Sequence, residues 1–182
     1  MANPATLYRF KISLSDIDRA LYEDLDIRAA MHPSEIEPYL LTRVLAYVLN
    51  YEEGLIFSAG LASADEPALQ LPEPGGNGRI AKWIDIGTPS MRRIHKASKM
   101  CRSVCIYTYK DPQLLRREAA KEKVHRANEI KLFAFQEAFL LSLAKVLKRD
   151  NQWAVIHTEG ELVITVGEET FIGTLTALTL GD

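Results

Sequence analysis

Residues 80–109 read IAKWIDIGTPSMRRIHKASKMCRSVCIYTY, and this stretch decides the fold. Its first part, Ile80 to Ile86, is a candidate strand, and Thr88-Pro89-Ser90 then opens an amphipathic helix that runs to about Arg102. The segment from Ser103 to Tyr109 is a nearly continuous apolar and β-branched run, which is typical of a strand buried on both faces. Strand, helix and strand in this order predict one crossover unit whose second strand lies centrally in the sheet.

A helix is predicted further towards the N-terminus. The residues typical of a helix start are Pro33, Ser34 and Pro38. Four apolar residues then recur at the spacing of one helix face, which predicts a helix from about residue 33 to Asn50. These four residues are Leu41, Val44, Leu45 and Val48. Glu35 and Glu37 are expected in the first turn, where the helix dipole favours carboxylates by about 0.3–1 kcal/mol each.

Strands and further helices are predicted around this centre. Between the first helix and the crossover, the strand candidates are Gly54 to Gly60, about Ala68 to Leu71, and Ile80 to Ile86, with a hairpin turn over Pro72 to Gly78. After the crossover come a helix from Asp111-Pro112 to about Arg126, a strand from Glu129 to Phe135 and a helix from Gln136 to Leu147. Alternating residues predict strands over 5–14 and Leu21 to Met31, and again in WAVIHT, ELVITVG and FIGTLTAL near the C-terminus.

These elements predict an α+β protein with a mixed sheet in a single domain of residues 1–182. The core is expected over about residues 33–150. The terminal strands, about 5–31 and 153–180, are too short to be stable alone, so they are expected to pair as one antiparallel β subdomain against the core. With 47% hydrophobic and 25% charged residues, the chain has the composition of a globular protein with a sizeable core.

Composition and charge exclude several classes of protein. The net charge of -2 gives no global attraction to nucleic acid or membrane, so any polyanion site must be a local patch. The N-terminus lacks the features of a secretory signal, and no apolar run approaches the ~20 residues of a membrane span. Cys101 and Cys105 are interpreted as reduced core thiols. A cytoplasmic protein without membrane contact is therefore expected.

Several common catalytic motifs are absent from the sequence. The Gly-rich segment from Gly75 to Gly78 lacks the lysine and hydroxyl of a phosphate loop and is interpreted as a hairpin tip. No serine-hydrolase elbow or zinc-protease motif is present, and the four histidines are scattered singly. Triad and zinc-protease chemistry are therefore unsupported.

Acidic residues near the predicted hairpin are the remaining candidates for chemistry. Asp85 lies in an apolar strand, where a carboxylate incurs a desolvation cost unless a cation or hydrogen-bond donors meet it, and Asp65 and Glu66 precede the neighbouring strand. Carboxylates on adjacent strands can hold Mg²⁺, and a nearby lysine can assist an attacking water. The candidate bases on the following helix are Arg92, Arg93, Lys96 and Lys99. A solvated basic face with an ion-paired Asp85 is the plainer alternative.

Five blocks of sequence, in order, resemble the YaeQ family of bacterial proteins over nearly the whole chain. They are TLYRFKISLSDIDR (6–19), MHPSEIEPYLLTRVLAYVLNY (31–51), GLASADEPALQ (60–70), KWIDIGTPSMRRIHKASK (82–99) and VCIYTY (104–109). That family is similar in its core to the PD-(D/E)xK nuclease superfamily, so the resemblance implies a restriction-endonuclease-like αβββαβ core. The residue patterns between Pro33 and Tyr109 predict the same element order.

The resemblance also implies roles for individual residues. Glu35 would be the acid of the first core helix, Asp65 or Glu66 the acid of the second strand, and Asp85 the acid of the third, gathered around a divalent metal. The superfamily's acid-x-lysine position reads Asp85-Ile86-Gly87 here, so the usual lysine is missing. A lysine displaced onto the following helix would replace it, with Lys96 first, and Lys99 or Arg93 next.

Three functional hypotheses follow. The first is a Mg²⁺-dependent phosphodiesterase acting on DNA or RNA, with Arg92, Arg93 and Lys99 contacting the nucleic acid. The second is a catalytically inactive nuclease-like fold that binds nucleic acid or a protein partner, which the missing lysine favours. In the third, the acids are ordinary salt-bridge partners of Arg92, Arg93 and Lys96, and the function lies elsewhere.

Overall fold

The computed structural model of the chain describes residues 4–58, 65–76 and 78–181. The strands are β1 (Thr6–Asp16), β2 (Leu21–Met31), β3 (Ile56–Phe57), β4 (Leu69–Pro72), β5 (Ile80–Ile86), β6 (Ser103–Thr108), β7 (Lys131–Phe135), β8 (Asp150–Thr158), β9 (Glu161–Val166) and β10 (Glu169–Thr179). The helices are α1 (Glu37–Leu49), α2 (Met91–Met100), α3 (Pro112–Glu122), the short 3₁₀ helix η1 (Ala127–Glu129) and α4 (Glu137–Ala144).

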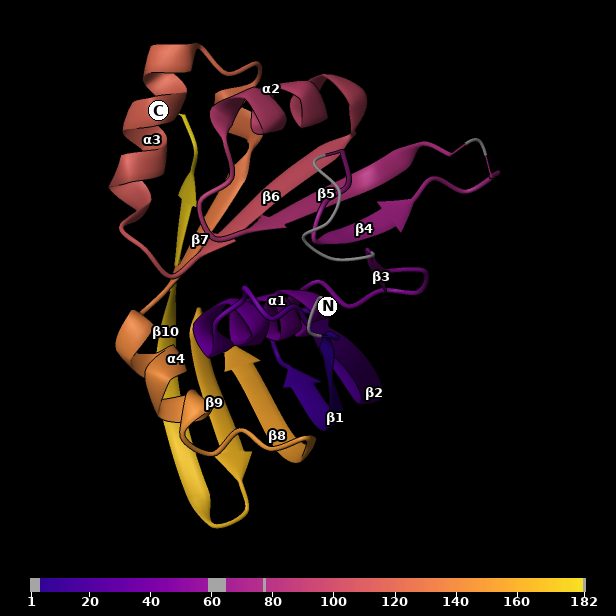
Figure 1. Cartoon of the computed structure of the whole chain (residues 1–182), viewed down its shortest axis with the longest axis vertical. Coiled ribbons are helices and arrows are strands. Elements are labelled where there is room, and N and C mark those ends of the chain that lie inside the picture. The colour runs from indigo at the N-terminus through magenta and orange to yellow at the C-terminus, as the bar shows by residue number, and fades with distance from the viewer. Residues whose placement is uncertain (1–3, 59–64, 77, 182) are drawn as a thin grey trace.

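All the described strands belong to one mixed sheet with the order β2-β1-β8-β9-β10-β7-β6-β5-β4-β3. The long strand β10 joins its two halves, because residues 169–174 pair with β9 and residues 175–179 pair with β7. Figure 1 shows the half formed by β1, β2, β8 and β9 below α1 and the half formed by β4 to β7 above it. The strands near the two chain termini therefore extend the sheet of the central strands.

Helix α1 lies between the two halves of the sheet (Figure 1). Ten of its 13 residues are buried. The sequence shows one apolar face for this helix, but in the structure the helix is enclosed on nearly all sides. Its side chains share one apolar cluster with the inner faces of β1, β2 and β8 and with Ile84, Cys105 and Tyr107 of the other half. Burial of this large apolar surface is the main stabilising contribution to the fold.

Helices α2 and α3 cover the opposite face of β5, β6 and β7. Ile94 of α2 and Leu115 of α3 share a second apolar cluster with Ile106 of β6. Because both faces of β6 are covered, five of its six residues are buried, as the apolar run in the sequence predicts. The parallel pairing of β5 with β6 around α2 is the predicted crossover.

Most predicted elements are present, but several details differ. Helices α3 and α4 end at Glu122 and Ala144, before the predicted ends at about Arg126 and Leu147. Helix α1 begins at Glu37, with Pro38 in its first turn, so the expectation that Glu35 lies in the first turn is wrong. The terminal strands are not purely antiparallel, because β1 and β8 pair in parallel. The strand predicted over residues 54–60 is only two residues long in the described part, and residues 59 and 60 lie outside the described residues.

Gly173 is a point of close packing in β10. A Cβ atom built at this glycine would lie 2.6–2.7 Å from ring atoms of Phe139, which is itself buried. We expect Gly173→Val to lower the free energy of unfolding by about 1–3 kcal/mol, because the phenyl ring must move within a close-packed core. Denaturant unfolding measures this loss. The exposed neighbour Thr174→Val is the matched control, and equal stability of the two variants would contradict the prediction.

Candidate functional site

Asp85 is a buried carboxylate with a complete set of hydrogen-bond donors. Its side chain is about 4% exposed, and it forms a two-point ion pair with Arg93: Nε lies 2.8 Å from Oδ2, and Nη2 lies 2.9 Å from Oδ1. The indole Nε1 of Trp83 also donates to Oδ2, at 2.8 Å. The guanidinium lies over the Trp83 ring, 5.1 Å from its centroid. A hydrogen bond and the charge of Asp85 together raise the pKa of Arg93, although burial opposes this.

Gly87, two residues after Asp85, is packed against Tyr39 of α1. Its backbone has a φ of +80°, which favours glycine, and a Cβ atom there would meet the Tyr39 ring at 3.5 Å. Burial raises the pKa of Tyr39 to about 12, and the charges of Arg43, Glu35, Asp85 and Arg93 also act on its hydroxyl. The tyrosine therefore lies within the field of two separate ion pairs.

The second ion pair joins Glu35 to Arg43 of α1. Glu35 lies just before the helix, and its Oε2 accepts from Arg43 Nη2 at 3.2 Å and from the His32 backbone N–H at 3.0 Å. Arg43 also donates to the Ala30 carbonyl at 2.6 Å, which ties α1 to β2. Both side chains are at most 4% exposed. Burial raises the pKa of Glu35 even though the Arg43 charge lowers it, and Oε1 has no hydrogen-bond partner among the described residues.

Asp65 and Glu66 are exposed and lie beside the Asp85–Arg93 pair. The Asp65 carboxylate, 78% exposed, accepts from Lys96 Nζ at 2.7 Å, and this contact lowers the pKa of Asp65. Glu66 contributes its backbone carbonyl, which accepts a hydrogen bond from Arg93 Nη2. The base first selected from the sequence, Lys96, therefore contacts the exposed acid, whereas Arg93 meets the buried acid.

The carboxylates as arranged do not fit a divalent cation. The described residues contain no group of three or more histidine, cysteine, aspartate or glutamate side chains placed to hold a metal ion. Arg93 occupies both oxygens of Asp85, and Arg43 occupies one oxygen of Glu35. Mg²⁺ prefers several oxygen ligands in octahedral geometry, and binding here would require these arginines to move away.

Sequence reasoning missed three members of the cluster. Trp83 could have been found, because period-two alternation places it on the same strand face as Asp85. Tyr39 and Arg43 gave no local signal, since both occupy ordinary helical positions and reach the acids only through the tertiary fold. We call Glu35, Tyr39, Arg43, Trp83, Asp85 and Arg93 the ion-paired cluster.

A strongly basic segment adjoins this cluster. Residues 88–131, which we call the basic lobe, contain 12 lysines and arginines and four acids, whereas the remaining residues contain ten lysines and arginines and 20 acids. The lobe comprises α2, β6, α3 and η1, and Figure 1 shows α2 and α3 together at one end of the molecule. Arg92, Lys96 and Lys99 are exposed along α2. A near-neutral chain thus contains a cationic end and an anionic remainder.

Arg126 joins the C-terminal end of α2 to the segment that follows α3. Its guanidinium donates to the Ser98 carbonyl and, at 2.9 Å, to the Cys101 carbonyl at the C-terminal end of α2. The His125 backbone N–H donates to His95 Nδ1 at 3.2 Å. Both contacts join α2 to the segment after α3, so the exposed cations of the lobe are held on a defined scaffold.

The fold and the ion-paired cluster define an α+β protein. Its described residues form one ten-stranded mixed sheet, with a basic two-helix lobe beside buried arginine–carboxylate pairs. The chain belongs to the YaeQ family: the family model described as YaeQ protein matches residues 1–174. No described helix is long and apolar enough to cross a membrane.

Relatives and solved structures agree with this assignment. YaeQ of Escherichia coli (strain K12) is 36% identical over 109 residues, and that of Salmonella typhi is 35% identical over the same length. These matches span 60% of this chain and 59% of each relative. The YaeQ crystal structure from Xanthomonas axonopodis pv. citri gives a TM-score of 0.87 at 26% identity over 96% of this chain and 98% of that one. The structure from Pseudomonas syringae gives 0.86 at 32% identity, with 98% of both chains covered.

Proposed function

We propose that this protein binds nucleic acid through the phosphate backbone, using the basic lobe, and that the ion-paired cluster stabilises the fold beside it. The observation that carries the proposal is the charge division: 12 of the 22 lysines and arginines lie in residues 88–131, with only four of the 24 acids. Such a field attracts polyanions even when the net charge of the chain is close to zero. The proposed setting is the bacterial cytoplasm.

The exposed cations of α2 favour contacts with phosphate rather than with bases. Arg92, Lys96 and Lys99 recur along one exposed stripe of α2, and Arg117, Lys121 and Lys123 are exposed in and after α3. Lysine and arginine contacts to phosphate position a duplex or a single strand without reading its sequence. We therefore expect binding with little sequence preference and strong dependence on salt.

The order of elements supports the nuclease-like part of the proposal. From α1 to β6 the elements follow the order α, β, β, β, α, β, which is the order implied by the resemblance to the PD-(D/E)xK superfamily. Asp85 lies in the third of these strands, but an arginine holds its carboxylate, and Gly87 replaces the lysine. A nuclease-like core retained for binding accounts for both departures.

Substitution of three α2 cations tests the proposal. We expect Arg92→Gln/Lys96→Gln/Lys99→Gln to weaken binding of fluorescent DNA and RNA oligonucleotides on the order of a hundredfold at low salt, because three charged contacts are lost. Fluorescence anisotropy with chelator present measures this loss. The matched control is Arg79→Gln/Lys145→Gln/Arg149→Gln, which removes the same charge outside the basic lobe. Equal loss in both variants, or absence of binding by the wild type, would contradict the proposal.

A Mg²⁺-dependent phosphodiesterase is the second candidate function. The observation that favours it is Glu35 Oε1, a buried carboxylate oxygen without a hydrogen-bond partner among the described residues, which a cation could satisfy if Arg43 moved away from Glu35. Metal-dependent cleavage of an oligonucleotide by the wild type, lost in Asp85→Asn, would replace the binding proposal by this one. Intact oligonucleotide with Mg²⁺ or Mn²⁺ present would support the binding proposal.

A further inference from the structure

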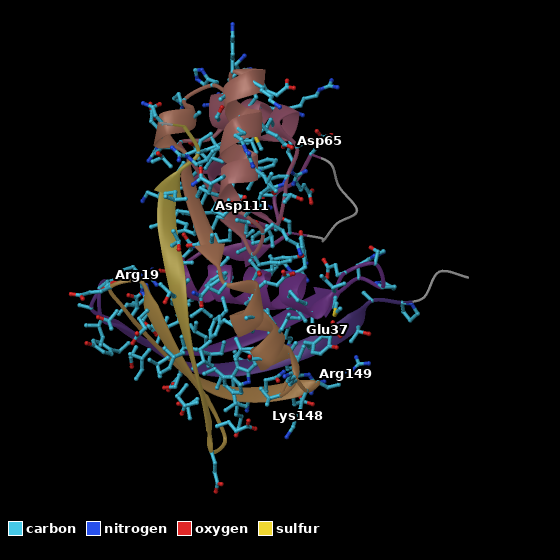
Figure 2. The ribbon with its side chains drawn as sticks, turned by 90° about the vertical axis from the view of Figure 1, so that its left-hand side faces the viewer. Arg19, Glu37, Asp65, Asp111, Lys148 and Arg149 are labelled. Atoms are coloured by element: carbon cyan, nitrogen blue, oxygen red, sulfur yellow. The ribbon has the colours of Figure 1, made fainter. Side chains whose placement is uncertain are left out.

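A cavity of about 640 Å³ lies at the opposite end of the molecule from the basic lobe. It is lined by β1, β2, β8, the segment between α4 and β8, and the turn between β9 and β10. Figure 2 shows Lys148, one of its lining residues, at the lower end of the molecule, whereas Asp65 lies at the upper end beside α2. Its volume lies within the range of about 300–1,000 Å³ that is typical of small-molecule sites.

Four cationic residues are among those that line this cavity. Arg9, Lys11, Arg28 and Lys148 line it, together with only two acids, Asp26 and Asp150. Asp150 pairs with Arg9 at 3.3 Å, and Asp26 is the register partner of Lys11. Arg28 and Lys148 have no ion-pair partner within the described part of the chain. The cavity thus has a positive excess although it lies in the anionic remainder of the molecule.

The strand register places two of these cations against each other. Arg9 of β1 and Arg28 of β2 are directly opposite in the antiparallel pair. Like charges at directly opposite positions are destabilising, because the side chains lie only about 4.5–5.5 Å apart at their Cβ atoms. An anion bound between them would remove this repulsion.

Buried polar groups hold the cavity wall in place. Asn151, 5% exposed, donates from Nδ2 to the Arg9 carbonyl at 3.1 Å and the Lys148 carbonyl at 2.6 Å, and its Oδ1 accepts from the Lys148 backbone N–H at 2.9 Å. The segment that carries Lys148 is therefore fixed beside β1. Trp153, whose ring packs against Phe10 in the apolar core, anchors β8 on the inner side of this wall.

We propose that this cavity binds a small phosphate-bearing anion, with Arg28 and Lys148 as the principal phosphate contacts and Arg9 and Lys11 beside them. Arginine and lysine are the side chains that best contact phosphate oxygens, and a cavity of this size has room for a nucleotide as well as for an inorganic phosphate. The proposal is independent of nucleic-acid binding by the basic lobe, since the two sets of residues do not overlap.

Isothermal titration calorimetry of the full chain with pyrophosphate, AMP and adenosine at matched ionic strength tests the proposal. We expect saturable binding of at least one phosphate compound and none of adenosine. Arg28→Gln/Lys148→Gln should weaken that binding by about tenfold or more, because two charged hydrogen-bond donors are removed. Lys145→Gln/Arg149→Gln is the matched control from the same segment, and these two residues do not line the cavity.

The results separate the two phosphate sources and the two binding sites. Binding of AMP more tightly than pyrophosphate would identify a nucleotide as the ligand class, whereas the reverse would identify an inorganic phosphate. The Arg92→Gln/Lys96→Gln/Lys99→Gln variant should bind the phosphate compound as the wild type does. Absence of saturable binding, equal affinity in the Arg28→Gln/Lys148→Gln variant, or loss of binding in the α2 variant would overturn the proposal.

Discussion

Replacement of Arg93 by leucine is expected to lower the free energy of unfolding by about 2–4 kcal/mol, because it leaves the Asp85 carboxylate buried without its cation. Asp85 is 3% exposed, so water cannot replace the two hydrogen bonds that the guanidinium donates. Trp83 Nε1 would remain as a donor, but a single neutral donor compensates only part of the cost of a buried charge. Urea denaturation at neutral pH measures the change.

The neighbouring arginine is the control for this variant. Arg92 is exposed, and Arg92→Leu should change stability by no more than about 0.5 kcal/mol, as is usual for surface substitutions. The double variant Asp85→Leu/Arg93→Leu should recover part of the loss, since it removes both charges together. If Arg92→Leu and Arg93→Leu are equally stable, Arg93 does not compensate Asp85.

Loss of the second buried cation is expected to be at least as costly. Arg43→Met should lower the free energy of unfolding by about 3–5 kcal/mol at neutral pH, because both members of the Glu35–Arg43 pair are buried and Glu35 would be left as an uncompensated charge. The hydrogen bond to the Ala30 carbonyl is lost as well. An exposed pair provides the comparison: Arg9→Met breaks the Arg9–Asp150 contact and should cost no more than about 1 kcal/mol.

The loss of stability caused by Arg43→Met should depend on pH in a defined direction. Burial holds the pKa of Glu35 above its ordinary value, so the folded state binds its proton more tightly than the unfolded state does. The stability that this tighter proton binding contributes is fully present below the pKa of Glu35 in the unfolded state. It is lost as pH rises through the pKa of Glu35 in the folded state. The destabilisation caused by Arg43→Met should therefore shrink as pH falls from 7 towards 4. A cost that grows towards acidic pH would show that Glu35 is not the group left uncompensated.

Regular residue patterns made most of the fold predictable. The alternation in β1 and β2 and the apolar run of β6 fix these strands, because each pattern reports directly which faces are buried. The sequence predicts the start of α1 too early, since Pro33 and Ser34 resemble a helix start. They belong instead to a turn in which Ser34 N–H donates to His32 Nδ1 at 3.1 Å. The parallel pairing of β1 with β8 depends on residues about 140 apart and has no local signal.

For the candidate site, the sequence predicts only that the buried Asp85 carboxylate needs a partner. A carboxylate in the apolar strand of Asp85 requires a cation for physical reasons, and that requirement is met by Arg93. Which base meets it depends on the angle between α2 and β5, so the sequence could not separate Arg93 from Lys96. The Glu35–Arg43 pair was missed because the two residues meet through the turn before α1 and its contact with β2.

The salt dependence of oligonucleotide binding tests the central claim most directly. The wild-type dissociation constant for a duplex, measured by anisotropy from low to physiological salt, should give a log–log slope of several units. In Arg92→Gln/Lys96→Gln/Lys99→Gln this slope should be smaller by about 0.9 for each phosphate contact removed, which amounts to roughly two to three units. Unchanged slopes in this variant, or wild-type binding that salt does not weaken, would contradict phosphate-backbone binding by the basic lobe.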